Sequence, residues 1–84
     1  MTNLETTLLD VRSRKEAAKS SIPGTLNIPH SEIINRINEI PEADKIVVFC
    51  SSGRRSIIIA EVLSALGYNA YNLRTIENVK KIYC

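Results

Sequence analysis

One continuous apolar run constrains the fold more than any other part of the chain. In the segment Lys45-Ile-Val-Val-Phe49, four consecutive apolar side chains follow a lysine. A strand with one solvated face alternates apolar and polar residues, whereas a strand covered on both faces is apolar at consecutive positions. Because parallel sheets carry helices on both faces, the run predicts a buried strand of a parallel sheet.

Three further segments have the composition of short strands. They are rich in β-branched and aliphatic residues and are bounded by turn residues, which is typical of strands. The segment 22–29, which contains two prolines and a glycine, is otherwise predicted to be a loop. Besides the apolar run, the predicted strands are 6–11, 26–28 and 69–73.

Helices are predicted between these strands and after the last one. Ser13 and Glu16 form a capping box that opens a helix through Lys19. The apolar segment 57–66 predicts a buried helix that ends before Gly67. Two more helices are predicted from apolar residues at helical spacing. One begins at Ser31 and ends before Pro41, with apolar residues Ile33, Ile34, Ile37 and Ile40; the other follows the capping residue Thr75, with Ile76, Val79, Ile82 and Tyr83 on one face.

The alternation of strands and helices predicts a three-layer α/β fold, in which a parallel sheet is flanked by helices. With 84 residues, the chain is long enough for one modest hydrophobic core. We therefore expect a single domain spanning residues 1–84.

Composition excludes several classes of protein. Eleven basic and nine acidic residues give a net charge of +2, too weak to indicate nucleic-acid binding. No apolar run approaches the roughly 18 residues of a membrane span, and the acidic N-terminal segment lacks the pattern of a signal peptide. Neither the two cysteines nor the one histidine has zinc-site spacing. The expected location is therefore the cytoplasm, with both cysteines reduced and no bound metal.

The most informative position is Cys50, at the predicted junction between a buried strand and a helix. Open α/β sheets place their active sites at such junctions. The amide groups of the helix N-terminus and the cations Arg54 and Arg55 would lower the pKa of the thiol, and Gly53 permits a turn in which several N–H groups point at one anion. The segment therefore indicates a nucleophilic thiolate held in an anion-binding loop.

Three simpler interpretations of Cys50 compete with a nucleophile. A small buried cysteine ending a strand does not account for the polar, cationic segment 51–55 that follows it. A phosphate-binding turn would suit the glycine and arginines, but the Lys-Ser/Thr ending of a P-loop is missing. A thioredoxin-like redox site would need a second cysteine at Cys-x-x-Cys spacing.

Three blocks of residues follow one another along the chain: Leu8-Leu-Asp-Val-Arg12 with Glu16, Ile22-Pro-Gly-Thr-Leu-Asn-Ile-Pro29, and Val47-Val-Phe-Cys-Ser-Ser-Gly-Arg-Arg-Ser56. Together these ordered blocks resemble the single-domain rhodanese-like sulfurtransferases, and in particular the short phage-shock type. Each block alone is a weak signal, but their order along the chain is specific.

The resemblance implies a persulfide mechanism without a cofactor. Cys50 would take the sulfane sulfur of thiosulfate or another small anionic donor and pass it to cyanide or to a thiol acceptor, which could be a protein. The residues expected to bind the donor form the loop after Cys50, and those expected to support it flank the loop. The binding set is Ser51, Ser52, Gly53, Arg54 and Arg55, and the supporting set is Asp10, Arg12 and Ser56.

Two other functions remain open at this point. The first is a carrier module that accepts a persulfide from a partner protein and delivers it elsewhere. The second is a cysteine-dependent phosphatase or arsenate reductase, which the resemblance disfavours because related enzymes have one more residue between cysteine and arginine. Segment 51–55 also contains no carboxylate that could act as a general acid.

The chain departs from the family pattern at several positions. Ser21 stands where a histidine is frequent, and Arg74-Thr75 replaces a Gly-Gly pair after the last predicted strand. Asp10 and Arg12 are as consistent with a surface ion pair as with a direct role in catalysis. Cys84 has no counterpart in the pattern; it is either inert or a relay thiol for the persulfide.

Overall fold

A parallel four-stranded sheet forms the centre of the structure. The computed structural model describes residues 5–42 and 45–84; residues 1–4 and 43–44 of the predicted domain 1–84 lie outside this range. The strand order is β2-β1-β3-β4, and each neighbouring pair is parallel. The strands are β1 (Thr6–Asp10), β2 (Leu26–Asn27), β3 (Lys45–Cys50) and β4 (Ala70–Thr75). The predicted parallel sheet is confirmed, with its strands displaced by at most two residues.

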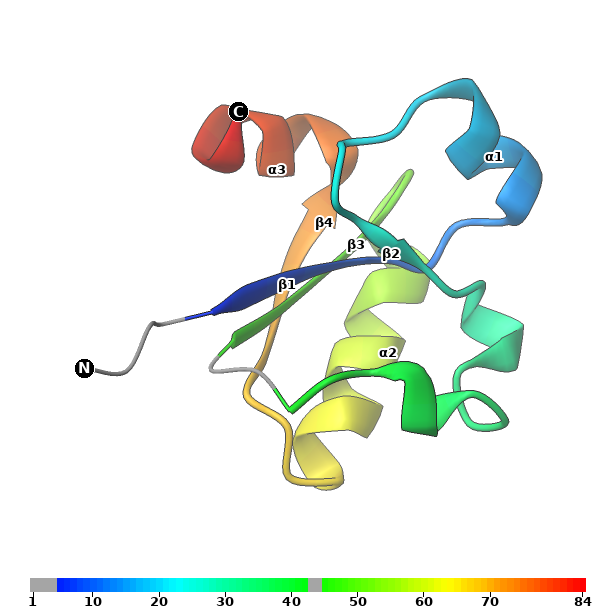
Figure 1. Ribbon diagram of the computed structural model, residues 1–84, viewed down its shortest axis with the longest axis vertical. Helices are drawn as coiled ribbons and strands as arrows, with labels where there is room; N and C mark the ends of the chain where they lie inside the picture. The colour runs from blue at the N-terminus through cyan, green and yellow to red at the C-terminus, as the bar shows by residue number, and fades with distance from the viewer. Residues whose placement is uncertain (1–4, 43–44) are drawn as a thin grey trace.

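Helices cover both faces of the sheet (Figure 1). Because alternate residues of β3 point to opposite sides, this strand contributes side chains to the core on each face. Ile46, Val48 and Cys50 belong to the core under α2 (Arg54–Ala65), whereas Val47 and Phe49 belong to the core under α3 (Ile76–Tyr83). All five side chains are at most 1% exposed. The predicted three-layer α/β fold is therefore confirmed, and the apolar run has the doubly covered position expected of it.

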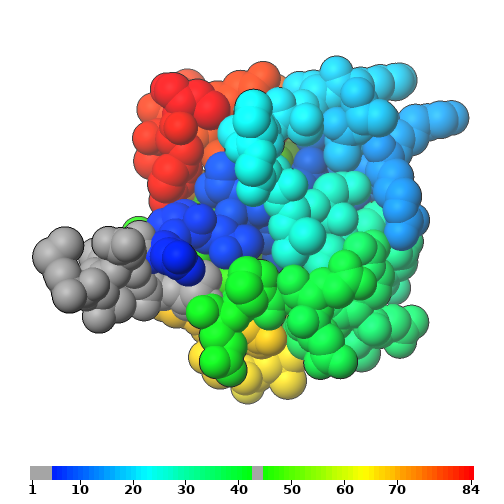
Figure 2. Space-filling view, in the orientation of Figure 1, coloured from blue at the N-terminus to red at the C-terminus, as the bar shows by residue number. Residues whose placement is uncertain are grey.

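Local capping signals fix the starts of two helices. At the start of α1 (Arg14–Lys19), the Glu16 N–H donates to Ser13 Oγ at 3.1 Å, and the Ser13 N–H donates to Glu16 Oε1 at 2.9 Å. At the start of α3, the Asn78 N–H donates to Thr75 Oγ1 at 3.2 Å. Both predicted caps are confirmed. Helix α1 contributes no buried residue, and its segment projects from one end of the molecule in the space-filling view (Figure 2).

The continuous helix predicted between Ser31 and Pro41 is wrong. The segment instead forms two short 3-10 turns, η1 (His30–Glu32) and η2 (Ile37–Glu39). Its residues are mostly β-branched isoleucine and asparagine, which are weaker helix formers than alanine or leucine. Ile33 and Ile40 are buried, one after each turn, but Ile34 is 64% exposed, so the apolar residues do not share one face.

Two other helix predictions need correction. Helix α2 begins at Arg54 rather than at Ile57, and Ile57 and Ile58 are 49% and 59% exposed, so the helix is buried on one side only. The buried side packs against the sheet through Ile59, Ala60 and Leu63, and the other side faces solvent. In α3, Ile76 and Val79 are buried as predicted, but Ile82 and Tyr83 lie beyond the sheet and are 61% and 39% exposed.

Candidate functional site

Cys50 is the last residue of β3, and its sulfur faces the loop that leads into α2. The residue is fully buried, at 0% exposure. The Gly53 N–H donates to Cys50 Sγ at 2.9 Å, and the thiol lies 3.5 Å from Ser56 Oγ, to which it donates when protonated. The loop therefore folds around the sulfur atom, and the structure brings Cys50, Gly53 and Ser56 together.

This loop conformation depends on glycine at position 53. Gly53 is the N-cap of α2 and has φ +90°, in the left-handed region that side chains disfavour. A Cβ at this position would lie 3.1 Å from Arg74 Cβ, closer than ordinary van der Waals contact. Only glycine combines the left-handed backbone with this close approach to Arg74 without strain. The position of the amide that contacts the sulfur therefore depends on residue 53 being glycine.

The surroundings of Cys50 lower the pKa of its thiol to about 7. Burial, the largest single influence, raises the pKa because it disfavours the charged thiolate. Hydrogen bonds from the Ser56 hydroxyl and from the backbone amides of Ser56, Ser52 and Gly53 together outweigh that effect. At neutral pH roughly half of the population is therefore thiolate, the reactive form of cysteine.

Arg55 turns toward α1, where it forms an ion pair with Glu16. Its Nη1 and Nη2 atoms donate to the two carboxylate oxygens at 2.9 and 3.1 Å, and Nη2 also donates to Ser51 Oγ at 2.9 Å. The hydrogen bond from Arg55 is the main reason why the pKa of Glu16 is lowered to about 2. Arg55 is thus held at the loop by a carboxylate from a distant segment.

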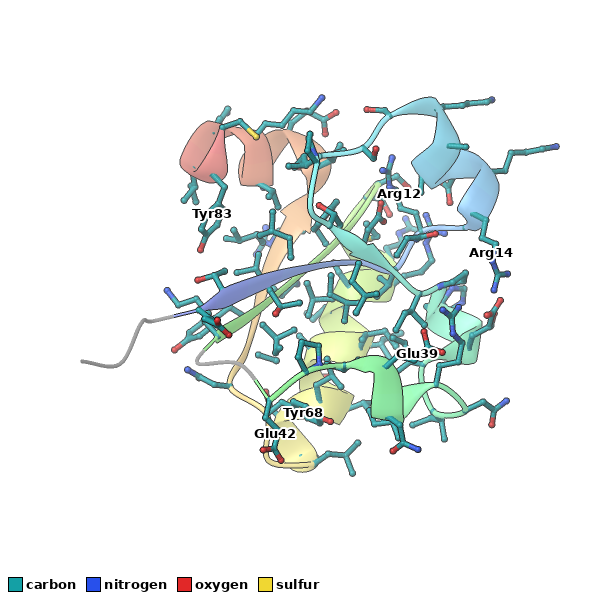
Figure 3. All side chains as sticks on the ribbon, in the orientation of Figure 1. Arg12, Arg14, Glu39, Glu42, Tyr68 and Tyr83 are labelled. Carbon is teal, nitrogen blue, oxygen red and sulfur yellow. The ribbon has the colours of Figure 1, made fainter. Side chains whose placement is uncertain are left out.

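Asp10 and Arg12 form a buried ion pair at the end of β1. The Arg12 Nε and Nη2 atoms donate to the Asp10 carboxylate at 2.8–3.1 Å, with side chains only 6% and 0% exposed. The hydrogen bond to Asp10 raises the pKa of Arg12. Figure 3 shows Arg12 among neighbouring segments and Arg14 at the outer edge. The surface-pair interpretation of Asp10 and Arg12 is therefore wrong.

This buried pair lies next to the strand that carries Cys50. The Val11 N–H donates to the Phe49 carbonyl at 3.0 Å, which joins the chain between Asp10 and Arg12 to the residue before Cys50. Arg12 Nη2 also donates to the Ser20 carbonyl, and the Asn27 side-chain amide donates to the carbonyls of Asp10 and Arg12. The pair thus fixes the segments beside the loop.

The remaining loop residues divide between the outer side of the loop and its buried interior. Ser52 and Arg54 are exposed, and the Arg54 N–H donates to Ser52 Oγ at 3.5 Å. Ser56 is buried, and its hydroxyl lies 3.2 and 3.4 Å from the carbonyls of Gly53 and Arg74, either of which accepts its single proton when Cys50 is a thiol; when Cys50 is a thiolate, the hydroxyl donates to the sulfur instead. The structure therefore separates the predicted site residues into an inner group at the sulfur and an outer group facing solvent.

Two residues at the site, Glu16 and Arg74, are absent from the set of site residues predicted from the sequence. Glu16 belongs to the first of the three family-like sequence blocks and to the capping box, but nothing in the sequence indicates that it pairs with Arg55, 39 positions away. Arg74 was visible as a departure from a Gly-Gly pair. In the structure it has φ +72°, a conformation suited to glycine, and its carbonyl accepts from Ser56.

The described residues hold neither a metal-binding cluster nor a membrane-spanning helix, and Cys84 lies away from the Cys50 loop. Residues 5–42 and 45–84 contain no group of three or more histidine, cysteine or acidic side chains arranged to hold a metal ion. Within the same ranges, no helix combines the length and apolarity needed to cross a membrane. Cys84 is exposed and follows the last turn of α3, so it is not part of the Cys50 loop.

Comparison with known proteins gives a consistent result. The family described as the rhodanese-like domain matches residues 1–75. The putative sulfur carrier protein YrkF of Bacillus subtilis is 43% identical over a match that covers 73% of this chain and 33% of that protein. The human thiosulfate:glutathione sulfurtransferase is 37% identical, with 73% of this chain and 65% of that protein covered. The chain thus spans a third to just under two thirds of these relatives' lengths.

A solved structure agrees with the fold. The crystal structure of a rhodanese-related protein from Thermoplasma volcanium superposes with a TM-score of 0.80 at 32% sequence identity. The match covers 94% of this chain and 81% of the other. The similarity therefore extends over nearly the whole chain.

Proposed function

The chain belongs to the rhodanese-like domain family, and we propose that it is a thiosulfate-type sulfurtransferase that carries sulfur as a persulfide on Cys50. One observation carries the proposal: the buried Cys50 sulfur lies at the end of β3 with the Gly53 amide 2.9 Å away and has a pKa of about 7. A thiolate at neutral pH and donors for a second sulfur anion are what persulfide chemistry requires.

In the first half-reaction, the Cys50 thiolate attacks the sulfane sulfur of thiosulfate. A bond forms between Cys50 Sγ and that sulfur, the S–S bond of thiosulfate breaks, and sulfite leaves with the electron pair. The negative charge then resides on the outer sulfur of the persulfide. Because Cys50 is fully buried, we expect a narrow donor that presents one terminal sulfur atom to react better than a bulky one.

Arg55 is the residue we propose for attracting the anionic donor. It is only partly buried and follows Cys50 by five positions, and its Nη2 atom donates to Ser51 Oγ. Glu16 compensates part of its charge, so the donor meets a moderated cation rather than a free one. Ser51, Ser52, Gly53 and Arg54 complete the loop, while Asp10, Arg12 and Ser56 hold it in place.

In the second half-reaction, a nucleophile takes the outer sulfur and restores the Cys50 thiolate. Cyanide would leave as thiocyanate, and a thiolate would become a persulfide. The similarity to a putative sulfur carrier favours a second candidate, in which the chain receives its sulfur from a partner protein and passes it on. Both candidates use the same cysteine and differ in whether small molecules suffice.

The proposal is tested by incubating the protein with thiosulfate and measuring its intact mass. We expect a gain of one sulfur atom in the wild type and in Cys84→Ser, but none in Cys50→Ser. Cys84→Ser is the matched control because that thiol is exposed and lies outside the loop. Absence of the gain in the wild type would contradict the thiosulfate reaction.

The remaining alternatives separate in the same assay. Thiocyanate formed from cyanide over many turnovers supports the enzyme, whereas loading only by a persulfidated protein supports the carrier. Hydrolysis of p-nitrophenyl phosphate that depends on Cys50 would instead indicate a phosphatase. Each outcome uses the same wild-type and Cys50→Ser preparations.

A further inference from the structure

A shallow groove begins at the outer side of the Cys50 loop, between α2 and the edge strand β4. Its first part has a cavity volume of about 270 Å³ and is lined by Ser52, Gly53, Arg54, Ile57, Asn72 and Arg74. The second part is lined by Ile57, Ala60, Glu61, Ser64, Ala70 and Asn72. Because both parts share Ile57 and Asn72, they form one path that leads away from the loop. We call this path the α2–β4 groove.

The arginines of the groove differ from the others in the chain. Arg12, Arg14, Arg36 and Arg55 each form an ion pair. Within residues 5–42 and 45–84, Arg54 and Arg74 have no ion-pair partner, and both are exposed. The end of the groove next to Cys50 therefore carries two uncompensated positive charges.

Arg74 occupies this place at a conformational cost. Its φ of +72° is left-handed, and it is the one described residue other than glycine with positive φ. The Asn72 Oδ1 atom accepts from the Arg74 N–H at 2.9 Å, which supports the turn. Glycine would adopt this conformation without strain, so the turn itself gives no reason for arginine. A strained residue with an unpaired charge beside a reactive centre points to a ligand.

The length of the groove distinguishes a small thiol from a polypeptide. Along α2, the path from Ile57 to Ser64 extends about 10 Å at the rise of an α-helix. An extended polypeptide covers about 3.3 Å per residue, so this part accommodates about three residues. A small thiol would fill only the part next to Arg54 and Arg74. The apolar surface of Ile57, Ala60 and Ala70 in the middle of the groove would then stay uncovered.

We propose that the α2–β4 groove binds the sulfur acceptor, and that this acceptor is an extended polypeptide segment with acidic residues next to its cysteine. The proposal rests on the proposed function and adds the acceptor to it. Guanidinium groups pair well with carboxylates, so Arg54 and Arg74 would hold the acidic residues. Gly53 lines the groove, and its N–H donates to Cys50 Sγ, so the groove adjoins the loop residue that contacts the sulfur.

The transfer needs no additional oxidant or reductant. The acceptor thiolate attacks the outer sulfur of the Cys50 persulfide, and a new S–S bond forms on the acceptor. The bond between the outer sulfur and Cys50 Sγ breaks, and its electron pair stays on Cys50 as the thiolate. The acceptor leaves as a persulfide.

The test compares two short peptides that differ only in the residues flanking one cysteine, aspartate in one and asparagine in the other. Starting from wild-type protein loaded with sulfur, we expect faster discharge to the aspartate peptide by about two- to tenfold at low salt, given two exposed ion pairs. The preference should shrink as salt rises. In Arg54→Glu/Arg74→Glu the preference should reverse, so that a third peptide with lysine beside its cysteine discharges the protein faster than the aspartate peptide. The control Lys80→Glu/Lys81→Glu has the same net charge change on α3 and should keep the wild-type preference.

A variant that preserves the fold separates binding from structural damage. Arg74→Gly removes the charge and also the strain at positive φ, so we expect a stable protein with a reduced preference for the aspartate peptide. Equal discharge rates for both peptides in the wild type would overturn the proposal. So would a small carboxylate-bearing thiol, such as glutathione, that matches the aspartate peptide in rate and in sensitivity to Arg74→Gly.

A direct binding measurement keeps the groove testable if thiosulfate fails to load Cys50. The same peptides with serine in place of cysteine are titrated into the protein, and backbone amide shifts are followed by NMR. We expect the aspartate peptide to perturb Gly53, Ile57 and Asn72 more than the asparagine peptide does. Failure to load Cys50 contradicts the proposed function alone, whereas perturbations outside the groove, or none, contradict the acceptor site.

Discussion

Cys50 and Cys84 are chemically identical side chains in two very different settings. Cys50 ends a buried strand, is fully buried, and has the Gly53 amide 2.9 Å from its sulfur. Cys84 follows the last turn of α3 and is exposed, and its backbone N–H donates to the Lys80 carbonyl. The two residues therefore separate the effect of the thiol itself from the effect of its surroundings.

The difference shows that burial does not by itself make a cysteine inert. Burial raises the pKa of Cys50, but hydrogen-bond donors around the sulfur reverse the direction and bring the pKa to about 7. The donors come from the loop and the first turn of α2, where amides are free because they have no partner within the helix. The loop converts a core position into a reactive one.

The largest expected effect comes from replacing the glycine that shapes the loop. Gly53→Ala puts a side chain at φ +90° and a Cβ 3.1 Å from Arg74 Cβ, so we expect a loss of about 1–3 kcal/mol in the free energy of unfolding. The Gly53 amide should also move away from Cys50, which slows persulfide formation. Urea denaturation and the rate of mass gain with thiosulfate measure the two effects.

Gly24→Ala is the matched control for this change. Gly24 has a similar φ of +84°, but a Cβ there would meet no atom within 4 Å. We expect only the conformational cost of about 1 kcal/mol and an unchanged rate of persulfide formation. If both variants lost the same rate of persulfide formation, the Gly53 amide would have no specific effect on the reactivity of Cys50.

The second effect is a dependence of stability on pH that arises from the thiolate of Cys50. Its pKa is about 7 in the folded protein, below the value of about 8.5 expected for an unfolded chain. For such a depressed pKa, the stabilisation is complete above the unfolded value and is lost as pH falls through 7. We expect about 2 kcal/mol between pH 9.5 and pH 6 when wild type is compared with Cys50→Ser.

Urea denaturation of Cys84→Ser over the same pH range provides the control. We expect it to retain the wild-type change because it still contains Cys50, and the ionisable groups common to all three proteins cancel in the comparison. If Cys50→Ser followed the wild-type curve at every pH, the thiolate of Cys50 would not be stabilised by the fold.

Local sequence signals predicted the elements of the fold well. The capping box at Ser13 and Glu16, the Thr75 cap and the apolar run at β3 depend on residues within a few positions of one another. The helix predicted from Ser31 failed because spacing alone does not show which isoleucines face the core, and Ile34 faces solvent. The sequence also predicted Ile57 and Ile58 to lie inside a buried helix, although they are 49% and 59% exposed.

The site was predictable only where it is local. The identity of Cys50 and the loop after it followed from a strand–turn–helix pattern and a family resemblance. The pairing of Arg55 with Glu16 and the burial of the Asp10–Arg12 pair depend on segments that meet only in three dimensions. The left-handed conformation of Arg74 is likewise set by its contacts with Gly53, Asn72 and Ser56.

A third, smaller effect follows from removing one hydrogen bond to the Cys50 sulfur. Ser56→Ala deletes the hydroxyl 3.5 Å from Sγ, and we expect the pKa of Cys50 to rise by about one unit, consistent with the loss of one hydrogen bond to a charged group. At pH 7 the thiolate fraction, and with it the rate of persulfide formation, should fall about fivefold. The pH profile of that rate should recover near pH 9.5.

Ser64→Ala, an exposed serine on the same helix, should leave the profile unchanged. Recovery at high pH distinguishes a shifted pKa from structural damage, because a misfolded loop would stay slow at every pH. A flat ratio of variant to wild-type rates across the pH range would therefore contradict the role of Ser56.

The smallest effect concerns how the donor reaches Cys50, and it leaves Cys84 untouched. Glu16→Gln removes the negative charge beside Arg55 while keeping a side-chain acceptor for the Ser13 N–H, so the helix cap is preserved. With its charge less compensated, Arg55 should lower the KM for thiosulfate about twofold, as expected for a partly exposed ion pair, and leave kcat unchanged. Because the pKa of Glu16 is about 2, the effect should be constant from pH 5 to pH 9.

Glu39→Gln, at a carboxylate that pairs with Arg36 away from the loop, should change neither constant. A raised KM in Glu16→Gln would instead show that the ion pair positions Arg55 for the donor rather than moderating its charge.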